Sequence, residues 1–570
     1  MTARSHVGSA IVETLVAQSV RMVTCVPGES FLPVLDALRD HRDDVQLIVA
    51  RHEASAGQAA VAHAMRTGRV GVCAVSRGPG ALHAAIAVHT AQQDAVPLLL
   101  LVGQVPMADL GRGAFQEISC EAVFGSMSKW VTRIERPERA AETIARAVRI
   151  AEAGRPGPVV VELPEDVLYE TVASVEENAD AGGRASVSFD VAKLTALAPL
   201  APLAGELSST TLERIREALS RSARPLVLLG RGGWGGEQHD GIRRFAERNT
   251  LPVAASFRCQ DAIDNRSSSY VGHFGFGADP ELVRMLAEAD CVIAIGGHFG
   301  DVETDGYTRR IGAPDAEIIH LAASEEDLDR TVRPTAAELV ASGAAVRALE
   351  SLDLDGTERW AEWTSAGRAA YLAHSTPPAS DRLGAMIAAA SELLGDDAVI
   401  CNGAGNYTGW LHRFYRYRNA GTQLAPANGA MAFGLPAGVA AAAAGCRDVV
   451  VFAGDGCFMM SAPELVTAAS AGLRLVVVVI NNNLFGTIRM HQDREFPQRD
   501  YGTELGNPDF VQLGNAHGFV SERVREVSEF EAALQAALGR AESTLIEIDA
   551  VGWPLTPAAA AGARSVSASG

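Results

Sequence analysis

The sequence has few cysteines and no long apolar run, and both absences narrow the class of protein. Its eight cysteines in 570 residues are scattered and form no CxxC pair, so neither a zinc site nor a disulfide framework is predicted. Buried free thiols in a reducing cytosol are the expected state. The apolar run 96–102 contains Pro97 and ends before Gly103, and no run reaches membrane-spanning length.

Positive charge is also in short supply, since the net charge is −20 at pH 7. This excess of acidic groups argues against nucleic acid or an anionic membrane as a partner. Residues 1–6 lead into an amphipathic helix pattern instead of the apolar region of a signal peptide, which supports a cytoplasmic protein. With 48% apolar and 21% charged residues, the composition is that of a globular protein, and the length predicts three domains.

Helix patterns alternate with short apolar strands along most of the chain, which predicts an α/β fold built on parallel sheets. Polar stretches at 171–208 and 353–379 read as linkers. The predicted domains are 1–172, 205–350 and 380–556, with a flexible tail at 557–570. The expected strands are 22–25, 46–49, 71–75, 97–102, 158–162, 225–229, 253–256, 291–295, 318–321, 398–401, 449–453, 475–480 and 544–548.

Two segments of the third region are most informative when they are read together. These are Gly454-Asp455-Gly456-Cys457-Phe458 and Asn481-Asn482-Asn483, in which Asp455 and Asn482 lie 27 positions apart. The chain between them reads as one helix followed by the β-branched strand 475–480. The carboxyl ends of neighbouring parallel strands meet at one edge of a sheet, where open α/β sheets bind ligands. We therefore expect both side chains at that edge.

A carboxylate and a side-chain amide there would form a hard-oxygen site of the kind that Mg²⁺ prefers, although a lone Gly-Asp-Gly is also a common tight turn. The two segments resemble the thiamine-diphosphate (ThDP) motif of the acetolactate synthase and pyruvate decarboxylase superfamily. The resemblance implies that Asp455, Asn482 and the backbone carbonyl of Leu484 hold Mg²⁺ on the cofactor diphosphate. Further cofactor contacts are expected from the neighbouring residues Gly454, Gly456, Cys457, Phe485 and Gly486.

Glu53 opens an Ala-rich helix after the strand 46–49. On local grounds, a Glu in the first turn is simply favourable with the helix dipole. The segment Arg51-His52-Glu53 resembles the R-H-E segment of the same superfamily, in which this Glu hydrogen-bonds N1′ of the ThDP aminopyrimidine. The resemblance implies that Glu53 is catalytic, because a carboxyl group that shares its proton with this ring nitrogen promotes deprotonation of the thiazolium carbon C2.

Two glycine-rich loops carry further cofactor residues by resemblance. The segment 428–436 is similar to the family's G-x-M-G-x-G-L-P segment, although a Met is most often a core residue. Met431 is then expected to wedge the cofactor into its bent form, and the Gly429 carbonyl to accept from N4′. The segment 402–410 reads locally as a turn but resembles G-Q-H-x-x-W, where Asn406 and Tyr407 would contact the diphosphate.

Substrate residues are expected in the first region. The segments 113–117 and 127–130 resemble the family's A-F-Q-E and T-K-x segments, which implies that Phe115 and Gln116 line the reaction pocket. Gln116 could polarise a substrate carbonyl or carboxylate. The segment 76–80 resembles S-G-P-G, in which Gly78 contacts the cofactor. Arg77 stands where Ser is usual, and it either binds a substrate carboxylate or is a solvated surface residue.

The sequence departs from the family pattern at two places. His491 stands where biosynthetic acetohydroxyacid synthases usually have a Trp that shapes the acceptor pocket. The segment 296–301 differs from the G-x-R-F-D-D of FAD-binding members, and the segment 320–323 lacks the acid of their H-I-D-x-D. These departures argue against FAD and against branched-chain amino-acid biosynthesis.

The resemblance implies three doubly wound domains, named pyrimidine-binding, middle and diphosphate-binding, in a homodimer or homotetramer. The implied reaction is decarboxylation of a small 2-oxo acid, followed by protonation or by addition to a carbonyl acceptor. An aldehyde lyase or a cyclic-diketone hydrolase would share the cofactor residues, and a pyruvate-oxidase-type enzyme would bind FAD. A non-catalytic regulatory homologue should have lost Glu53 or the metal pair, and this chain has kept both.

Overall fold

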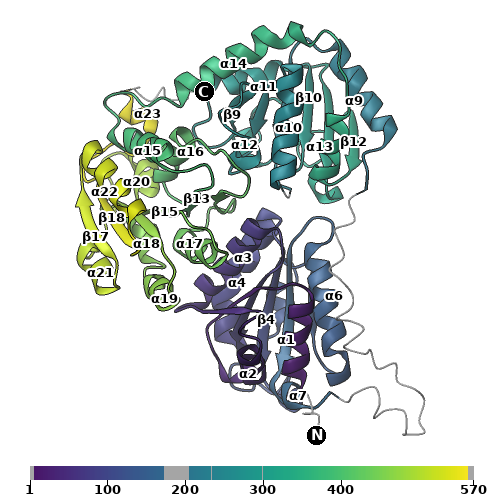
Figure 1. Cartoon of the computed structure of the whole chain (residues 1–570), viewed down its shortest axis with the longest axis vertical. Helices are drawn as coiled ribbons and strands as arrows, with labels where there is room; N and C mark the ends of the chain where they lie inside the picture. The colour runs from purple at the N-terminus through teal and green to yellow at the C-terminus, as the bar shows by residue number, and fades with distance from the viewer. Residues whose placement is uncertain (1–5, 173–204, 233, 298, 563–570) are drawn as a thin grey trace. The chain divides into compact units, whose positions relative to one another are not determined.

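The computed structural model of the chain describes residues 6–172, 205–232, 234–297 and 299–562. It contains three six-stranded parallel sheets flanked by helices, which confirms the predicted α/β fold (Figure 1). The described residues divide into two compact units. The first unit is the described part of 1–203 together with Val439–Gly445 and Pro463–Leu473, and the second unit is the remainder.

The first sheet has the strand order β2-β1-β3-β4-β6-β5. Its strand β4 is buried over its whole length, as is typical of a parallel sheet that is covered on both faces. Helix α1 packs against α2 and α6, and α3 packs against α4 (Figure 1). The elements are α1 (Val7–Ala17), β1 (Met22–Cys25), α2 (Leu32–Asp40), β2 (Gln46–Val49), α3 (Glu53–Thr67), β3 (Gly71–Ser76), α4 (Arg77–Asp94), β4 (Leu98–Gln104), α5 (Cys120–Phe124), β5 (Trp130–Arg133), α6 (Ala140–Glu152), β6 (Pro158–Pro164) and α7 (Glu165–Tyr169).

The second sheet has the order β12-β11-β10-β7-β8-β9 and lies in the second unit. Helix α10 packs against α13, and α11 packs against α14. The elements are α9 (Ser209–Arg221), β7 (Pro225–Leu229), α10 (Gly236–Asn249), β8 (Val253–Ala255), β9 (Tyr270–His273), α11 (Pro280–Glu288), β10 (Cys291–Ile295), α12 (Asp301–Thr304), β11 (Glu317–Ala322), β12 (Ala336–Leu339), α13 (Ser342–Glu350) and α14 (Ala361–His374).

The third sheet, also in the second unit, has the order β14-β13-β15-β16-β18-β17. Its central strands β15 and β16 are Val-rich and buried, as the sequence predicts. The elements are α15 (Arg382–Leu393), β13 (Val399–Asn402), α16 (Tyr407–Phe414), β14 (Gln423–Leu424), α17 (Gly434–Ala443), β15 (Val449–Gly454), α18 (Asp455–Met459), α19 (Glu464–Ser470), β16 (Val476–Asn481), α20 (Gly486–Glu495), α21 (Phe510–Ala516), β17 (Val520–Val524), α22 (Val527–Gly539), β18 (Thr544–Asp549) and α23 (Pro557–Ala560).

Two of the predicted irregular segments are helical instead. The expected linker 353–379 contains helix α14. The residue directly before this helix, Trp360, is fully buried. The Trp360 indole N–H donates to the Ser222 carbonyl at 2.9 Å, so this segment is anchored to its domain. The expected flexible tail begins with α23, in which Ala560 is buried, so the tail prediction is wrong for residues 557–560. Residues 563–570, and residues 173–204 of the other predicted linker, lie outside the described part of the chain.

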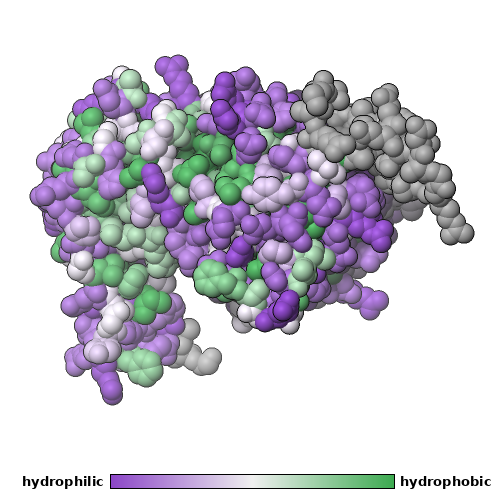
Figure 2. Space-filling view, turned by 90° about the horizontal axis from the view of Figure 1, so that it is seen from below, coloured by the Kyte–Doolittle hydropathy of each residue, from purple (hydrophilic) through white to green (hydrophobic). Residues whose placement is uncertain are grey.

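The described helices include none that is long and apolar enough to cross a membrane. On the face seen in Figure 2, polar residues are interspersed with apolar ones. Free thiols are buried, as expected, at Cys25, Cys73, Cys120, Cys291, Cys401 and Cys457.

Candidate functional site

The two central strands of the third sheet bring Asp455 and Asn482 to one edge. β15 pairs with β16 in parallel, with Gly454 opposite Ile480. β15 ends at Gly454 and α18 begins at Asp455, while β16 ends at Asn481, directly before Asn482. The predicted juxtaposition of the two side chains at the carboxyl edge is therefore what the sheet register produces.

A cavity of about 570 Å³ opens at this edge, within the range of small-molecule sites. All the residues of the second unit that the sequence assigns to the cofactor line it: Asn406, Tyr407, Gly429, Met431, Gly454, Asp455, Gly456, Cys457, Asn482, Leu484, Phe485 and Gly486. These residues come from separate loops that follow different strands, so their meeting in one cavity depends on the fold of the whole domain.

Asp455 is a buried carboxylate, with only 3% of its surface exposed. Its Oδ1 accepts the Gly456 N–H at 2.9 Å, and its Oδ2 accepts from Asn507 Nδ2 at 2.8 Å. Burial raises the pKa of Asp455, and these hydrogen bonds offset part of that rise. No basic side chain of the described residues forms an ion pair with it. A bound cation would supply the missing compensation.

Asn482 and Leu484 present oxygens to the same cavity. Asn482 Oδ1 accepts the Leu484 N–H at 3.1 Å, which fixes the amide beside the turn. Leu484 forms an antiparallel bridge with Glu504, and its own carbonyl oxygen accepts no hydrogen bond from the described residues. A carboxylate, an amide oxygen and an open carbonyl are the ligand types that suit Mg²⁺.

The side-chain amide of Asn406 is only half satisfied by the described residues. Its Oδ1 accepts from the Thr487 hydroxyl at 2.7 Å, whereas its Nδ2 is buried without a hydrogen-bond partner in the described structure. Leaving a buried donor unpaired costs about 1–3 kcal/mol. An acceptor such as a phosphate oxygen would remove that cost. The neighbouring Tyr407 hydroxyl is already engaged, because it accepts the Gly403 N–H at 3.0 Å.

The loop with Met431 is tied to the Asp455 segment through Cys457. The Cys457 sulfur accepts the Ala432 N–H at 3.3 Å, and Gly429 and Met431 both face the cavity. Ala432 has φ +66°, a left-handed conformation that an alanine adopts at a cost of about 1 kcal/mol. Glycine would avoid that cost.

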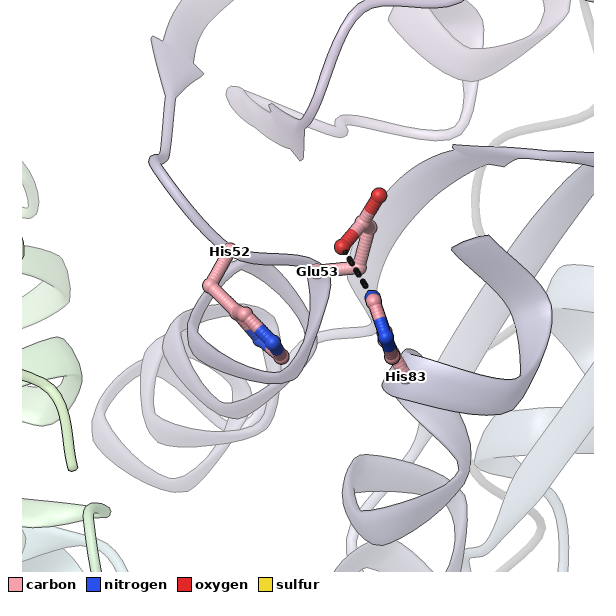
Figure 3. A group of neighbouring side chains, drawn as sticks. All are labelled: His52, Glu53 and His83. Atoms are coloured by element: carbon pink, nitrogen blue, oxygen red, sulfur yellow. Dashed lines mark hydrogen bonds and ion pairs between the residues drawn. The ribbon is translucent and has the colours of Figure 1, made fainter. Parts of the chain in front are cut away.

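Glu53 lies in the first unit, at the start of α3 (Figure 3). Its side chain is 18% exposed, and its Oε2 lies 2.8 Å from His83 Nδ1 on α4. The His83 ring stacks on His52, with ring centroids 4.6 Å apart. Glu464, in the α19 segment of the same unit, accepts the Arg51 N–H at 3.1 Å and so fixes the chain just before Glu53.

The predicted substrate residues of the first unit lie around the start of α4. Arg77 is 12% exposed, and its guanidinium donates to Glu165 Oε2 at 2.7 Å, so it is neither a solvated surface residue nor uncompensated. The Gly78 N–H donates to the Gln116 carbonyl at 2.9 Å. Gln116 has φ +64°, and Phe115 beside it is 77% exposed.

His491 is not among the residues that line the cavity of the second unit. It is exposed on α20, and its Nδ1 lies 3.1 Å from Arg494 NH2. Thr487 and Ile488, one turn earlier on the same helix, do line the cavity.

Three parts of the site were missed by sequence reasoning. Asn507 holds Asp455 and also donates to Asn481 and Asn483, both at 3.0 Å. Arg258 of the middle domain is buried and donates to the carbonyls of Gly403, at 3.0 Å, and Pro426. Residues 552–555 and Ala560 also line the cavity. Only the positive charge of Arg258 and its neighbouring aromatic Phe257 could have drawn attention to these positions.

The donor set fits a divalent cation and a phosphorylated cofactor. An uncompensated buried carboxylate, an open carbonyl and an unpaired amide donor face one cavity. Gly456 allows Phe485 to pack closely at this edge, because a Cβ at position 456 would lie 2.6 Å from the Phe485 ring. Fold and site together define a cofactor-dependent α/β enzyme.

Comparison with known proteins identifies the family. Three family models match the chain. Residues 5–123 match "Thiamine pyrophosphate enzyme, N-terminal TPP binding domain". Residues 212–350 match "Thiamine pyrophosphate enzyme, central domain", and residues 403–548 match "Thiamine pyrophosphate enzyme, C-terminal TPP binding domain". The chain therefore belongs to the ThDP-dependent enzymes of the acetolactate-synthase superfamily, as its motifs indicate. It is a ThDP-dependent enzyme of the decarboxylase and carboligase type.

Several relatives align over almost the whole chain. The acetolactate synthase large subunit of Corynebacterium glutamicum is 29% identical, and the alignment covers 93% of this chain and 84% of the relative. The acetolactate synthase isozyme 1 large subunit of Escherichia coli is 29% identical, with 98% and 96% covered. The probable acetolactate synthase large subunit of Methanocaldococcus jannaschii is 28% identical, with 95% and 91% covered.

We predict that Asp455→Ala abolishes measurable binding of ThDP in the presence of Mg²⁺. Asp455 is the anionic side chain that we assign to the metal, and Mg²⁺ on a diphosphate normally keeps one or two carboxylate ligands. Calorimetric titration measures the affinity directly. Asp493→Ala, which removes a carboxylate that is 55% exposed on α20, is the control and should bind normally. Unchanged affinity in Asp455→Ala would refute the assignment.

Proposed function

We propose that this enzyme is a Mg²⁺-dependent decarboxylase and carboligase of small 2-oxo acids. Asp455, Asn482 and the Leu484 carbonyl would hold the metal, and Asn406 would donate to the cofactor diphosphate. The observation that carries the proposal is one cavity lined by two residues: the buried Asp455, which has no basic partner among the described residues, and Asn406, whose amide nitrogen has no acceptor among them. The similarity to acetolactate synthase large subunits supports the reaction class.

When bound, ThDP would supply a nucleophilic carbon for addition to the 2-oxo carbonyl and a cationic ring to accept the electron pair that departure of CO₂ leaves behind. The side chains of this chain then have separate tasks. Glu53 would hold a proton at the aminopyrimidine N1′ through its carboxyl group. Gln116 would donate a hydrogen bond to the carbonyl or carboxylate of the 2-oxo acid. Phe115 would exclude water from that face, and Met431 would support the bent cofactor.

The cofactor residues of one chain are divided between two units, with Glu53 in the first and the metal residues in the second. In the superfamily, the cofactor lies between the first domain of one subunit and the third domain of its neighbour. We therefore propose a homodimer, or a homotetramer built from it. The buried free thiols, such as Cys73 and Cys401, favour a reducing compartment, and we propose the cytoplasm.

Supplying a panel of 2-oxo acids with ThDP and Mg²⁺ tests the function. Release of CO₂ together with an aldehyde, an acyloin or an acetohydroxy acid, identified by mass spectrometry, is the expected result. Cleavage of acyloins or cyclic diketones, with no turnover of any 2-oxo acid, would replace the proposal with a lyase or a hydrolase.

We predict that Glu53→Gln binds ThDP but slows hydrogen exchange at C2 by at least about a hundredfold, the scale of lost acid–base assistance. Gln keeps the shape of the side chain and cannot carry the proton. Quenched-flow NMR measures the exchange. Glu142→Gln changes a first-turn Glu of α6 and controls for the helix-dipole alternative, so its exchange should match wild type. A wild-type exchange rate in Glu53→Gln would exclude the role.

We predict that the purified protein carries no stoichiometric FAD, because the segments 296–301 and 320–323 lack the residues of FAD-binding relatives. His298 lies outside the described residues. The Nε2 atom of His320 lies 2.9 Å from the Gly297 carbonyl oxygen. Flavin fluorescence in the supernatant after heat denaturation is the measurement, with added FAD as the recovery control. One FAD per subunit would show the prediction to be wrong.

We predict that His491→Trp shifts the products toward acetohydroxy acids, since an indole would favour an aliphatic acceptor more than an imidazole does. The affinity for ThDP should stay within about threefold, or under about 1 kcal/mol. Product profiles with pyruvate alone and with pyruvate plus 2-oxobutyrate decide the question. Arg494→Ala, which removes the residue that contacts His491 and also pairs with Glu495, is the control and should leave the product ratio unchanged. An unchanged product ratio would place His491 outside the acceptor pocket.

A further inference from the structure

His83 is the side chain that contacts Glu53 most directly. The distance from His83 Nδ1 to Glu53 Oε2 is 2.8 Å, and the two residues belong to the packed helices α4 and α3 (Figure 3). Neither the family motif at residues 76–80 nor the reaction described above assigns a task to this histidine. A hydrogen bond of this length restricts where the bonded carboxylate oxygen can lie.

The His83 ring is itself held in place from a second side. It stacks on the His52 ring with an interplanar angle of 26°. His52 is fixed in turn, because its Nδ1 accepts the Ala54 N–H at 3.1 Å as the N-cap of α3. The imidazole of His83 is thus constrained although its side chain is 53% exposed.

The two oxygens of the Glu53 carboxylate have different surroundings. Oε2 is engaged by His83, whereas Oε1 takes part in no hydrogen bond among the described residues. Gly80 lies beside Oε1, since a Cβ at that position would make an ordinary van der Waals contact with it at 3.6 Å. The carboxylate therefore has one anchored oxygen and one open oxygen.

We propose that His83 is a positioning residue for Glu53, which holds Oε2 so that Oε1 is presented to the aminopyrimidine N1′. The inference rests on the proposed role of Glu53. It predicts that the rate of hydrogen exchange at C2 depends on a hydrogen-bond donor at the position of the His83 Nδ1. An Asn at position 83 would place its amide nitrogen close to the present position of the His83 Nδ1. A Gln would place its amide nitrogen one bond further along the side chain.

The effect of this donor is measured on the full-length holoenzyme at saturating ThDP and Mg²⁺. His83→Ala and His83→Gln should slow hydrogen exchange at C2 by about 10- to 100-fold, the range for a misplaced or unsupported functional group. His83→Asn should recover a rate within about threefold of wild type. His89→Ala, on the same helix α4, is the control and should leave the rate unchanged. Calorimetry should show ThDP affinities within about threefold for all four variants.

A second measurement uses the protein without cofactor. In ¹H–¹⁵N spectra of the histidine rings, the His83 signals should show a hydrogen-bonded Nδ1, and Glu53→Gln should shift them while those of His89 stay unchanged. Slow hydrogen exchange at C2 in His83→Ala and His83→Gln, but not in His83→Asn, supports the proposal. Wild-type exchange in all His83 variants, together with slow exchange in Glu53→Gln, overturns it and leaves the role of Glu53 intact. Wild-type exchange in Glu53→Gln overturns both.

Discussion

The parallel pairing of β15 with β16 is the constraint on which the cofactor site depends. Register places Gly454 opposite Ile480, and both strands are continued by polar residues at the same edge. A shift by one residue would turn every side chain of a strand to its other face and would separate Asp455 from Asn482. The Val-rich, fully buried strands resist such a shift, so the energy that stabilises the core also determines where the metal ligands lie.

The same arrangement buries one charged group and one polar group whose partners the described protein residues do not fully supply. Within the part of the chain that the structure describes, the buried Asp455 has no basic partner and the buried Asn406 amide nitrogen has no acceptor. Arg258 adds a buried positive charge close behind the loops that carry Gly403 and Pro426, which links the middle domain to the site. A Mg²⁺–diphosphate ligand would satisfy the first two groups at once, and so the affinity for metal and the affinity for cofactor should be coupled.

Much of this could be predicted from the sequence, because the central strands are continuous apolar runs and the site residues follow them directly. The missed strands, β5, β9, β12, β14 and β17, all lie at the edges of their sheets. Three of them, β5, β12 and β17, are partly exposed and lack that signal; β17, for example, has the polar sequence Val-Ser-Glu-Arg-Val. β9 and β14 are mostly buried but have only four and two residues. Contacts such as Asn507 to Asp455, or His83 to Glu53, join residues far apart in the chain and appear only once the tertiary structure is known.

In the proposed site, a divalent cation at the carboxyl edge of β15 and β16 would link this chain to the ThDP diphosphate. Crystals grown with ThDP and Mn²⁺ in place of Mg²⁺ would test it by anomalous scattering. One strong peak per subunit, bounded by Asp455, Asn482, the Leu484 carbonyl and two phosphate oxygens, is the predicted result. A bound cofactor with its metal peak away from Asp455 and Asn482, or no peak at all, would contradict the account.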